Sequence, residues 1–276
     1  MEGWRLLSYQ RGSAAENMAV DEALFREAVR KESPPTLRFY GWQKPTVSLG
    51  HFQDARREID IEACRRFDID IVRRLTGGKA VLHEQEVTYA VVAADDSPLF
   101  PPDILGTYRL ISACIAQGLS AIGIAAEMAS EGRAKTEGTA SAACFAHPSR
   151  YELLVAGRKI CGSAQRRSPG VFLQHGALLM TFDPRRTSAV LMPPFHSQGR
   201  REDLQKTVTS VGEHAPSVDE ETLCRVLQEG FRQVLGVRFV EGSLTPAEED
   251  LKKELLKKYE SDRWNLEGRK SWNSEL

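Results

Sequence analysis

Apolar residues recur every three or four positions in several parts of the chain, which is the spacing of one face of an α-helix. Between residues 105 and 122 this repeat includes Ile111, Ile115 and Leu119. Ser13 and Ser217 stand where they can cap two further repeats, and Gly236 ends the second of these. The pattern predicts helices over residues 14–29, 59–67, 105–122, 219–235 and 246–259.

β-Branched and alternating apolar residues predict strands between these helices. The predicted strands cover residues 4–9, 36–42, 46–51, 70–75, 87–93 and 170–182, with a hairpin of 151–156 and 159–163. Gly157 allows the positive φ that the tight turn of this hairpin needs. The elements do not follow a strict βαβ alternation. We therefore predict an α/β (α+β) fold with a mixed, mainly antiparallel sheet flanked by helices.

Three segments show neither repeat. Residues 125–143 are small and polar, which is typical of a loop or of a flap that a ligand orders. Residues 183–210 are rich in Pro and Arg and are expected to be irregular, and residues 261–268 are expected to be coil. We expect one domain over residues 1–276, with its core at about 33–248 and a helical tail over 245–276.

The charge balance mainly excludes classes of partner. With 37 basic and 38 acidic residues, the 276-residue chain has a net charge of −1. It has no global positive field that would attract nucleic acid or an anionic membrane. No run approaches the roughly 18–20 apolar residues of a membrane span, and the N-terminus lacks the apolar segment of a signal peptide. We expect a cytoplasmic protein.

The cysteines are scattered, with no CxxC pair and no spacing typical of a metal site. They are Cys64, Cys114, Cys144, Cys161 and Cys224. The odd count and the absent signal peptide indicate reduced thiols, most of them small buried hydrophobes. Cys144 differs because it lies among small and polar residues.

Two other sequence features are better explained by a structural role than by a function. The run from His83 to Glu86 lacks the HExxH spacing and a strong third ligand, so no metal site is predicted. The charged helix at residues 251–259 could present a basic partner surface, but a solvated face with Leu251, Leu255 and Leu256 turned to the core is the favoured interpretation.

A Gly-Gly segment is the first candidate binding element. Gly77 and Gly78 let the backbone approach a ligand closely, and Arg73 and Arg74 can pair with phosphate or carboxylate. The segment runs on to His83 and matches neither GxxxxGK[ST] nor GxGxxG. A turn between two strands with solvated arginines explains the pattern equally well.

The second candidate is a nucleophilic pair. The hairpin would hold Lys159 rigidly, and an ammonium near Cys144 would lower the pKa of that thiol from about 8.5. The competing interpretation is a Cys–His pair with His147 or His175, and a solvated lysine with an inert cysteine is the default.

Several motifs together resemble the lipoate/octanoate-transferring branch of the biotin/lipoate–protein ligase family. They are ENMAVDEALF, RRLTGGKAVLHEQEVTYAV, YELLVAGRKICGSAQRR, FLQHGALL and KYESDRWN, and they follow the family's order from about Asn17 to Asn265. The likeness is strongest to octanoyltransferases. It implies a biotin/lipoate protein ligase-like catalytic domain that moves an octanoyl group from acyl carrier protein to a lysine of a lipoyl domain such as the glycine cleavage H protein.

The resemblance also implies roles for residues. Cys144 would be the nucleophile and Lys159 the group that lowers its pKa. Backbone N–H groups near Gly77, Gly78, Ser163 and Ala164 are candidates for the oxyanion site. The implied substrate-binding residues are Arg73, Arg74, Gly77, Gly78, His83, Ser163, Ala164, Gln165, His175 and Gly176. No metal, nucleotide or other cofactor is expected.

Other activities remain open at this point. An ATP-dependent lipoate–protein ligase shares these motifs, but that group often carries a further C-terminal domain and gives Cys144 no task. An amidotransferase that takes octanoyl from H protein would use the same cysteine chemistry. A non-catalytic acyl- or biotin-binding regulator is disfavoured by the presence of both Cys144 and Lys159.

Overall fold

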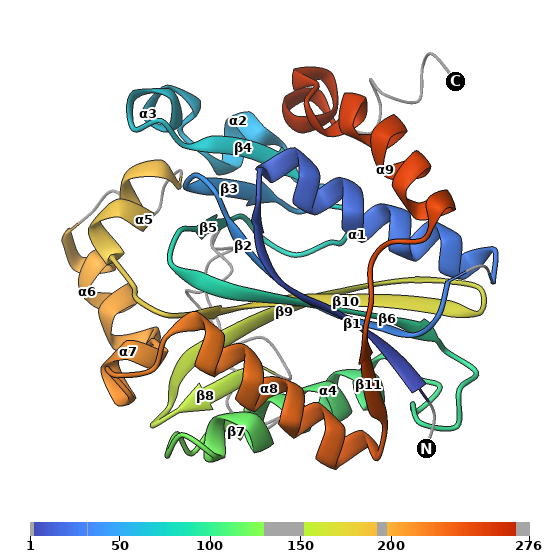
Figure 1. Ribbon diagram of the computed structural model, residues 1–276. Helices are drawn as coiled ribbons and strands as arrows, with labels where there is room; N and C mark the ends of the chain where they lie inside the picture. The colour runs from blue at the N-terminus through green and yellow to red at the C-terminus, as the bar shows by residue number, and fades with distance from the viewer. Residues whose placement is uncertain (1–2, 32, 130–151, 192–197, 269–276) are drawn as a thin grey trace.

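A large mixed sheet forms the centre of the protein (Figure 1). The computed structural model describes residues 3–31, 33–129, 152–191 and 198–268. Within these ranges the sheet has the order β11-β1-β2-β6-β10-β9-β8-β7. Its strands are β1 (Gly3–Gly12), β2 (Thr36–Trp42), β6 (Glu86–Ala94), β7 (Glu127–Met128), β8 (Leu153–Val155), β9 (Arg158–Ser168), β10 (Val171–Leu179) and β11 (Arg238–Glu241). Strands β11, β1 and β2 pair in parallel and the rest antiparallel, so the predicted sheet class is confirmed.

A second, small sheet lies beside the first. It consists of β4 (Asp70–Arg73), β3 (Thr46–Leu49) and β5 (Val81–His83), in that order. The helices α2 (Ala55–Glu58), α3 (Ile61–Arg66) and α5 (Pro184–Val190) lie around it. Buried side chains of this sheet, such as Val47 and Leu49, form a separate core with buried residues of the helices, such as Cys64 of α3. The strand predicted over residues 46–51 and the helix predicted over 59–67 are therefore present in shorter form.

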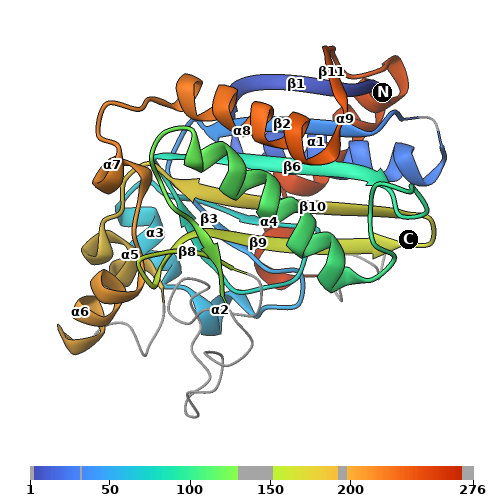
Figure 2. The same cartoon turned by 90° about the horizontal axis from the view of Figure 1, so that it is seen from below.

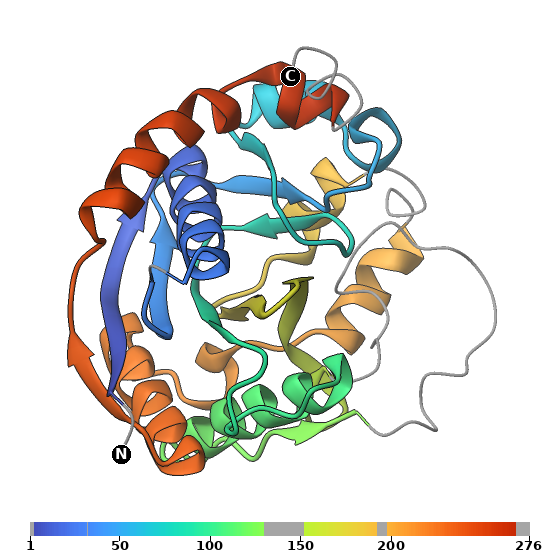
Figure 3. The same ribbon diagram turned by 90° about the vertical axis from the view of Figure 1, so that its right-hand side faces the viewer.

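Helices cover both faces of the large sheet (Figures 2 and 3). The helices α1 (Ala14–Val29) and α9 (Pro246–Tyr259) lie together on one face, and α4 (Ile104–Ser120) and α8 (Glu220–Leu235) lie together on the other. The apolar repeat of α4 faces the sheet, since Ile111, Ile115 and Leu119 are buried in one core with Phe231 of α8. Each face thus has its own apolar core.

Helix ends that carry local signals lie where the sequence predicts them. Ser13 and Glu16 form a capping box at the start of α1, and Thr245 and Glu248 form another at the start of α9. Gly236 takes a φ of 65° at the end of α8, a conformation that glycine adopts at little cost.

Three local predictions are wrong. The segment 183–210, expected to be irregular, contains α5 and α6 (Gln198–Thr207), and α7 (Val211–His214) follows it. Asp219, not Ser217, caps α8 by accepting from the Thr222 N–H. Residues Arg263–Glu267, expected to be coil, form a π-helix, η1.

The C-terminal segment is bound to the rest of the molecule by buried polar contacts. Leu251 and Leu255 are buried, as expected for the core side of α9. The Lys258 ammonium lies 2.6 Å from the Glu22 carboxylate of α1. No helix in the described ranges is both long and apolar enough to cross a membrane.

Candidate functional site

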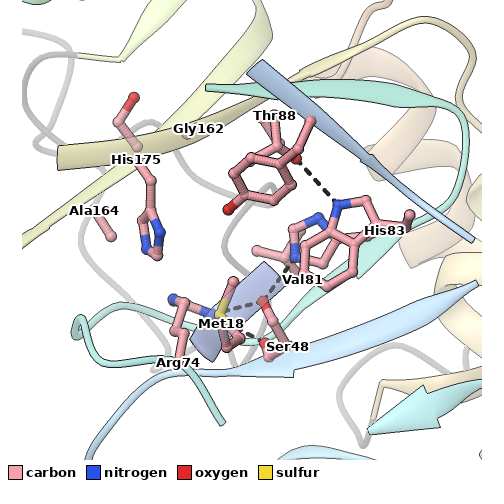
Figure 4. Close-up of a pocket in the computed structure, with 14 residues that line it drawn as sticks. Met18, Ser48, Arg74, Val81, His83, Thr88, Gly162, Ala164 and His175 are labelled. Atoms are coloured by element: carbon pink, nitrogen blue, oxygen red, sulfur yellow. Dashed lines mark hydrogen bonds between the residues drawn. The ribbon is translucent and has the colours of Figure 1, made fainter. Parts of the chain in front are cut away.

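A pocket opens between the two sheets (Figure 4). Its apolar wall comes from α1 and from both sheets and includes Met18, Trp42 and Val81. A few polar groups converge on it, which is the usual composition of a small-molecule site. The lining residues are Met18, Tyr40, Trp42, Ser48, Arg74, Val81, His83, Thr88, Gly162, Ser163, Ala164, His175, Gly176 and Ala177.

His83 lies between a hydroxyl and a carboxylate. Its Nε2 is 2.7 Å from Ser48 Oγ on β3, and its Nδ1 is 2.6 Å from Glu86 Oε1 on β6. The Trp42 indole stacks on the imidazole with 4.3 Å between ring centroids. Trp42 Nε1 and Thr88 Oγ1 also donate to Glu86 Oε1, at 3.1 and 2.6 Å. The ring is therefore fixed in position and in its hydrogen-bond partners.

Arg74 holds the same hydroxyl from the other side. Its Nη1 donates to Ser48 Oγ and to the Ser48 carbonyl, each at 3.0 Å. The remaining nitrogens donate to the carbonyls of Gly77 and Lys79. The guanidinium thus ties the Gly-Gly segment to β3 while it lines the pocket.

His175 lies between a second hydroxyl and carboxylate. Its Nε2 is 2.7 Å from Thr76 Oγ1, and its Nδ1 is 2.9 Å from Asp21 Oδ2 on α1. Arg38 donates to the other Asp21 oxygen at 2.6 Å, and Tyr40 OH donates to Oδ2 at 2.9 Å. Burial raises the pKa of Asp21, but the Arg38 guanidinium and the hydrogen bond with His175 outweigh it, so this pKa lies below its usual value.

The wall formed by β9 and β10 brings four predicted residues together. Their register places Ser163 opposite Gly176 and Ala164 opposite His175, and all four line the pocket. A Cβ on Gly176 would lie 2.6 Å from the Gly162 carbonyl oxygen, so only glycine fits there. Gln165 does not line the pocket; its amide donates to Gln174 at 3.0 Å.

The Gly-Gly segment packs against the small sheet. Gly78 has a φ of +92°, and a Cβ on Gly50 would come within 2.0 Å of its carbonyl oxygen. Arg74, which lines the pocket, donates to the Gly77 carbonyl. Gly77 and Gly78 themselves are not among the lining residues. Positive φ at Gly78 is what requires glycine in this segment.

Arg73 lies away from the pocket, and its contacts link chain segments. Its guanidinium donates to the carbonyls of Gly50, Gln53, Trp264 and Asn265. It borders a separate, broad groove between the α2–α3 segment and η1. Its contacts explain how η1 is attached to β4, and its predicted substrate-binding role stays untested.

Lys159 is buried in an ion pair. Its ammonium bonds the Glu152 carboxylate, and both side chains are almost wholly inaccessible. The backbone is fixed as well, since Lys159 pairs with Leu154 of β8 and its carbonyl accepts from the Thr209 N–H at 2.9 Å. The hairpin therefore holds Lys159 rigidly, as predicted, with a carboxylate partner that was not foreseen.

Cys144 and His147 lie outside the described residues, as does most of the 125–143 segment. The other thiols, on Cys64, Cys114, Cys161 and Cys224, are free and buried. Burial raises the pKa of Cys161 to about 12. The described residues contain no cluster of three or more His, Cys, Asp or Glu side chains suited to a metal ion.

Comparison with known proteins decides the family. The model of the lipoyl protein ligase A/B catalytic domain matches residues 13–232. The chain belongs to this family.

Two relatives and two solved structures show where in the family it falls. Octanoyltransferase LipM of Kyrpidia tusciae is 45% identical, over 96% of this chain and 99% of the relative. Octanoyltransferase LipM of Bacillus subtilis is 37% identical, over 96% and 98%. A lipoate-protein ligase A structure bound with ATP has a TM-score of 0.80 at 29% identity, covering 96% and 99% of the two chains. A bipartite lipoate protein ligase of Thermoplasma acidophilum has a TM-score of 0.79 at 28% identity, covering 96% of each.

Ser48, Glu152 and Glu86 are among the residues of this candidate site that were not candidates from the sequence. Ser48 is an isolated serine in a strand, Glu152 precedes a strand, and Glu86 was considered only as part of a metal motif. Glu86 stands three residues after His83, a spacing that was the only local signal for their contact.

Proposed function

We propose that this chain is an octanoyltransferase of protein lipoylation that carries the acyl group on Cys144. The observation that carries the proposal is the level of identity. Octanoyltransferases are 36–45% identical over 95–96% of this chain, whereas the two solved ligases are 28–29% identical. The enzyme is an acyltransferase, and its reaction takes an acyl donor and a lipoyl-domain acceptor.

The pocket supports an acyl substrate. Its wall offers Met18, Trp42 and Val81 to a medium-length chain, and each buried CH₂ contributes about 0.8 kcal/mol. The polar groups gather around Ser48 and the two imidazoles, where the thioester carbonyl would end. An octanoyl group would thus be held by its tail and oriented by its head.

The reaction would proceed in two halves. In the first, the Cys144 thiolate attacks the thioester carbonyl of the donor, a new C–S bond forms, and the donor thiol leaves. In the second, the amine of the acceptor lysine attacks the acyl-cysteine, an amide forms, and the C–S bond breaks. Thioester exchange is nearly balanced in energy, and amide formation makes the overall reaction favourable.

Lys159 is the proposed source of positive charge for the thiolate. In the described structure its ammonium is already paired with Glu152. A thiolate placed beside Lys159 would therefore share the ammonium with a carboxylate, which weakens the effect of the cation on the thiol. The pair also holds the ammonium at one point, because both side chains are buried.

The specific partners belong to the proposal. We propose octanoyl-acyl carrier protein as the donor and a lipoyl-domain protein such as the glycine cleavage H protein as the acceptor, both in the cytoplasm. One solved relative comes from an archaeal lipoylation system that comprises a ligase and its E2 lipoyl domain, which supports a lipoyl domain as the acceptor here.

A lipoate–protein ligase is the second candidate, because the structure resembles a ligase bound with ATP. An omission assay separates the two. Purified protein, octanoyl-acyl carrier protein and apo-H protein are incubated with and without ATP, and octanoylated H protein is measured by mass spectrometry. Equal transfer without ATP is expected, and transfer that requires ATP and free octanoate would contradict the proposal. Octanoyl-H protein as donor to a second lipoyl domain tests the amidotransferase alternative.

A further inference from the structure

We propose that Ser48, His83 and Glu86 form a proton relay that accepts the proton of the incoming lysine amine in the second half-reaction. This inference rests on the proposed transfer to a lysine. A lysine amine has a pKa of about 10.4, so only roughly one in 2,500 is unprotonated at pH 7. When the neutral amine adds to a carbonyl carbon, its nitrogen must also lose a proton before the amide is complete.

The hydrogen bonds fix the direction of the relay. Arg74 can only donate, so Ser48 Oγ accepts from Arg74 at 3.0 Å. The Glu86 carboxylate accepts from His83 Nδ1–H at 2.6 Å, so the neutral ring has its lone pair on Nε2, and the Ser48 hydroxyl donates to that nitrogen at 2.7 Å. A hydroxyl, an imidazole and a carboxylate in this order are the arrangement of a general base with its orienting acid.

Two members of the relay face the part of the pocket where the acyl carbonyl is expected. Ser48 and His83 line the pocket, and both side chains are otherwise buried. Only a molecule inside the pocket can reach them. Glu86 is 2% exposed, and Trp42 covers one face of the imidazole.

Among the described residues, His83 is the ion-pair partner of Glu86, and no arginine or lysine pairs with this carboxylate. Within the described residues, Glu86 Oε2 has no hydrogen-bond partner. Besides His83, two groups donate to Glu86 Oε1, namely Trp42 and Thr88, and both are neutral. A buried carboxylate with neutral donors gains most from a cation beside it. Other charged or titratable groups around these residues include Arg74, which contacts Ser48, and the Asp21 group of Arg38, Tyr40 and His175. Glu84 and Cys161 also lie close enough to Glu86 to interact with its charge.

The proposed step balances as follows. The lone pair of the neutral amine forms the new C–N bond at the thioester carbonyl. One N–H proton passes to Ser48 Oγ while the Ser48 proton passes to His83 Nε2, giving an imidazolium beside Glu86. The C–S bond then breaks with its electron pair on sulfur, and the relay returns the proton to that sulfur. The products are the amide and the Cys144 thiol.

The test measures the two half-reactions separately in Ser48→Ala and Glu86→Gln, each checked for folding by circular dichroism. Octanoyl-enzyme is first formed from octanoyl-acyl carrier protein and isolated, and it is then mixed with apo-H protein. No amine loses a proton in the first half-reaction, so formation of the octanoyl-enzyme is expected to fall much less than transfer does. Transfer at pH 7 is expected to slow by about 100-fold or more, because general bases contribute about 10²–10⁴, and the deficit is expected to shrink as the pH rises.

Thr76→Val is the matched control, because it removes the hydroxyl that faces the other imidazole. Its transfer rate is expected to stay within about threefold. The relay is contradicted if both half-reactions fall together at every pH, if transfer is unchanged in the variants, or if octanoate is found as an ester on Ser48. If Glu86→Gln does not fold, the rates of the two half-reactions in Ser48→Ala alone decide whether the relay exists. Failure of the unmodified protein to form any octanoyl-enzyme would instead contradict the proposed function.

Discussion

Two histidines face the same pocket, and their surroundings differ in charge although their geometry is alike (Figure 4). His83 and His175 each have a hydroxyl at 2.7 Å from Nε2 and a carboxylate near Nδ1. The carboxylate beside His175, Asp21, has an arginine partner. The carboxylate beside His83, Glu86, receives hydrogen bonds only from neutral groups and the imidazole among the described residues.

The difference decides what each imidazole can do. The charge of Asp21 is compensated by Arg38 whether or not His175 is protonated, so this group mainly joins α1 to the sheet. Among the described residues, the group beside Glu86 that can carry a positive charge is His83. Similar hydrogen-bond geometry therefore gives a structural group on one wall and the proposed proton acceptor on the other.

The largest predicted effect is on stability. Asp21→Asn leaves the buried Arg38 without its carboxylate and is expected to cost about 3–5 kcal/mol of unfolding free energy. Glu86→Gln removes no ion pair with an arginine or lysine and is expected to cost about 1–3 kcal/mol. Urea unfolding measures both, and equal losses would show that the two carboxylates are not differently compensated.

A second prediction concerns the ion pair between Lys159 and Glu152, which resembles the Asp21–Arg38 pair in being buried. Glu152→Gln frees the ammonium from its carboxylate, so alkylation of Cys144 is expected at lower pH. The double variant Lys159→Ala/Glu152→Ala removes both charges, and its alkylation midpoint is expected to rise by about one pH unit or more. Iodoacetamide labelling followed by peptide mass spectrometry measures both midpoints.

The buried Cys161 is the internal control for that measurement. Burial raises its pKa to about 12, so it should stay unlabelled in the folded protein. If the midpoint of Cys144 is the same in all three proteins, Lys159 has no role in activating the thiol.

A third prediction concerns the stability of the protein at acidic pH. The pKa of Asp21 is lowered in the folded protein, so its stabilising contribution is complete above the unfolded value of about 3.9 and is lost as the pH falls through the folded pKa. Asp21→Asn is expected to flatten the loss of stability below about pH 4. Urea midpoints measured between neutral pH and acid test this, and parallel curves for the two proteins would contradict it.

The smallest predicted effect is that of Thr88→Val. It removes one neutral donor, 2.6 Å from Glu86 Oε1, and is expected to cost about 1 kcal/mol. Differential scanning calorimetry measures the change. A loss as large as that of Asp21→Asn would mean that neutral donors, and not charge, hold these carboxylates.

Features with local sequence signals could be predicted. The start of α1 follows from Ser13 and Glu16, and that of α9 from Thr245 and Glu248, because capping boxes act within one turn. The helix α5 had a comparable signal, since Asp183 caps it and Pro184 stands at its first position. The Pro- and Arg-rich composition around it masked that signal.

The contacts that build the site could not be predicted, because they join residues far apart in the chain. Asp21 and His175 are separated by 154 positions, and Arg73 and Asn265 by 192. Ser48 carries no pattern of its own until the small sheet places β3 beside β5. The sequence indicates side chains that can take part in catalysis, such as His83 and Lys159, but their hydrogen-bond and ion-pair partners follow only from the fold.

The most direct test of the central proposal is to locate the acyl group. The intact protein is mixed with octanoyl-acyl carrier protein without ATP, digested, and mapped by mass spectrometry, with Cys144→Ser and Cys161→Ala treated in parallel. We predict one octanoyl group on Cys144, present in Cys161→Ala and absent as a thioester in Cys144→Ser. An unmodified Cys144 in a protein that nevertheless octanoylates its acceptor would contradict the acyl-cysteine mechanism.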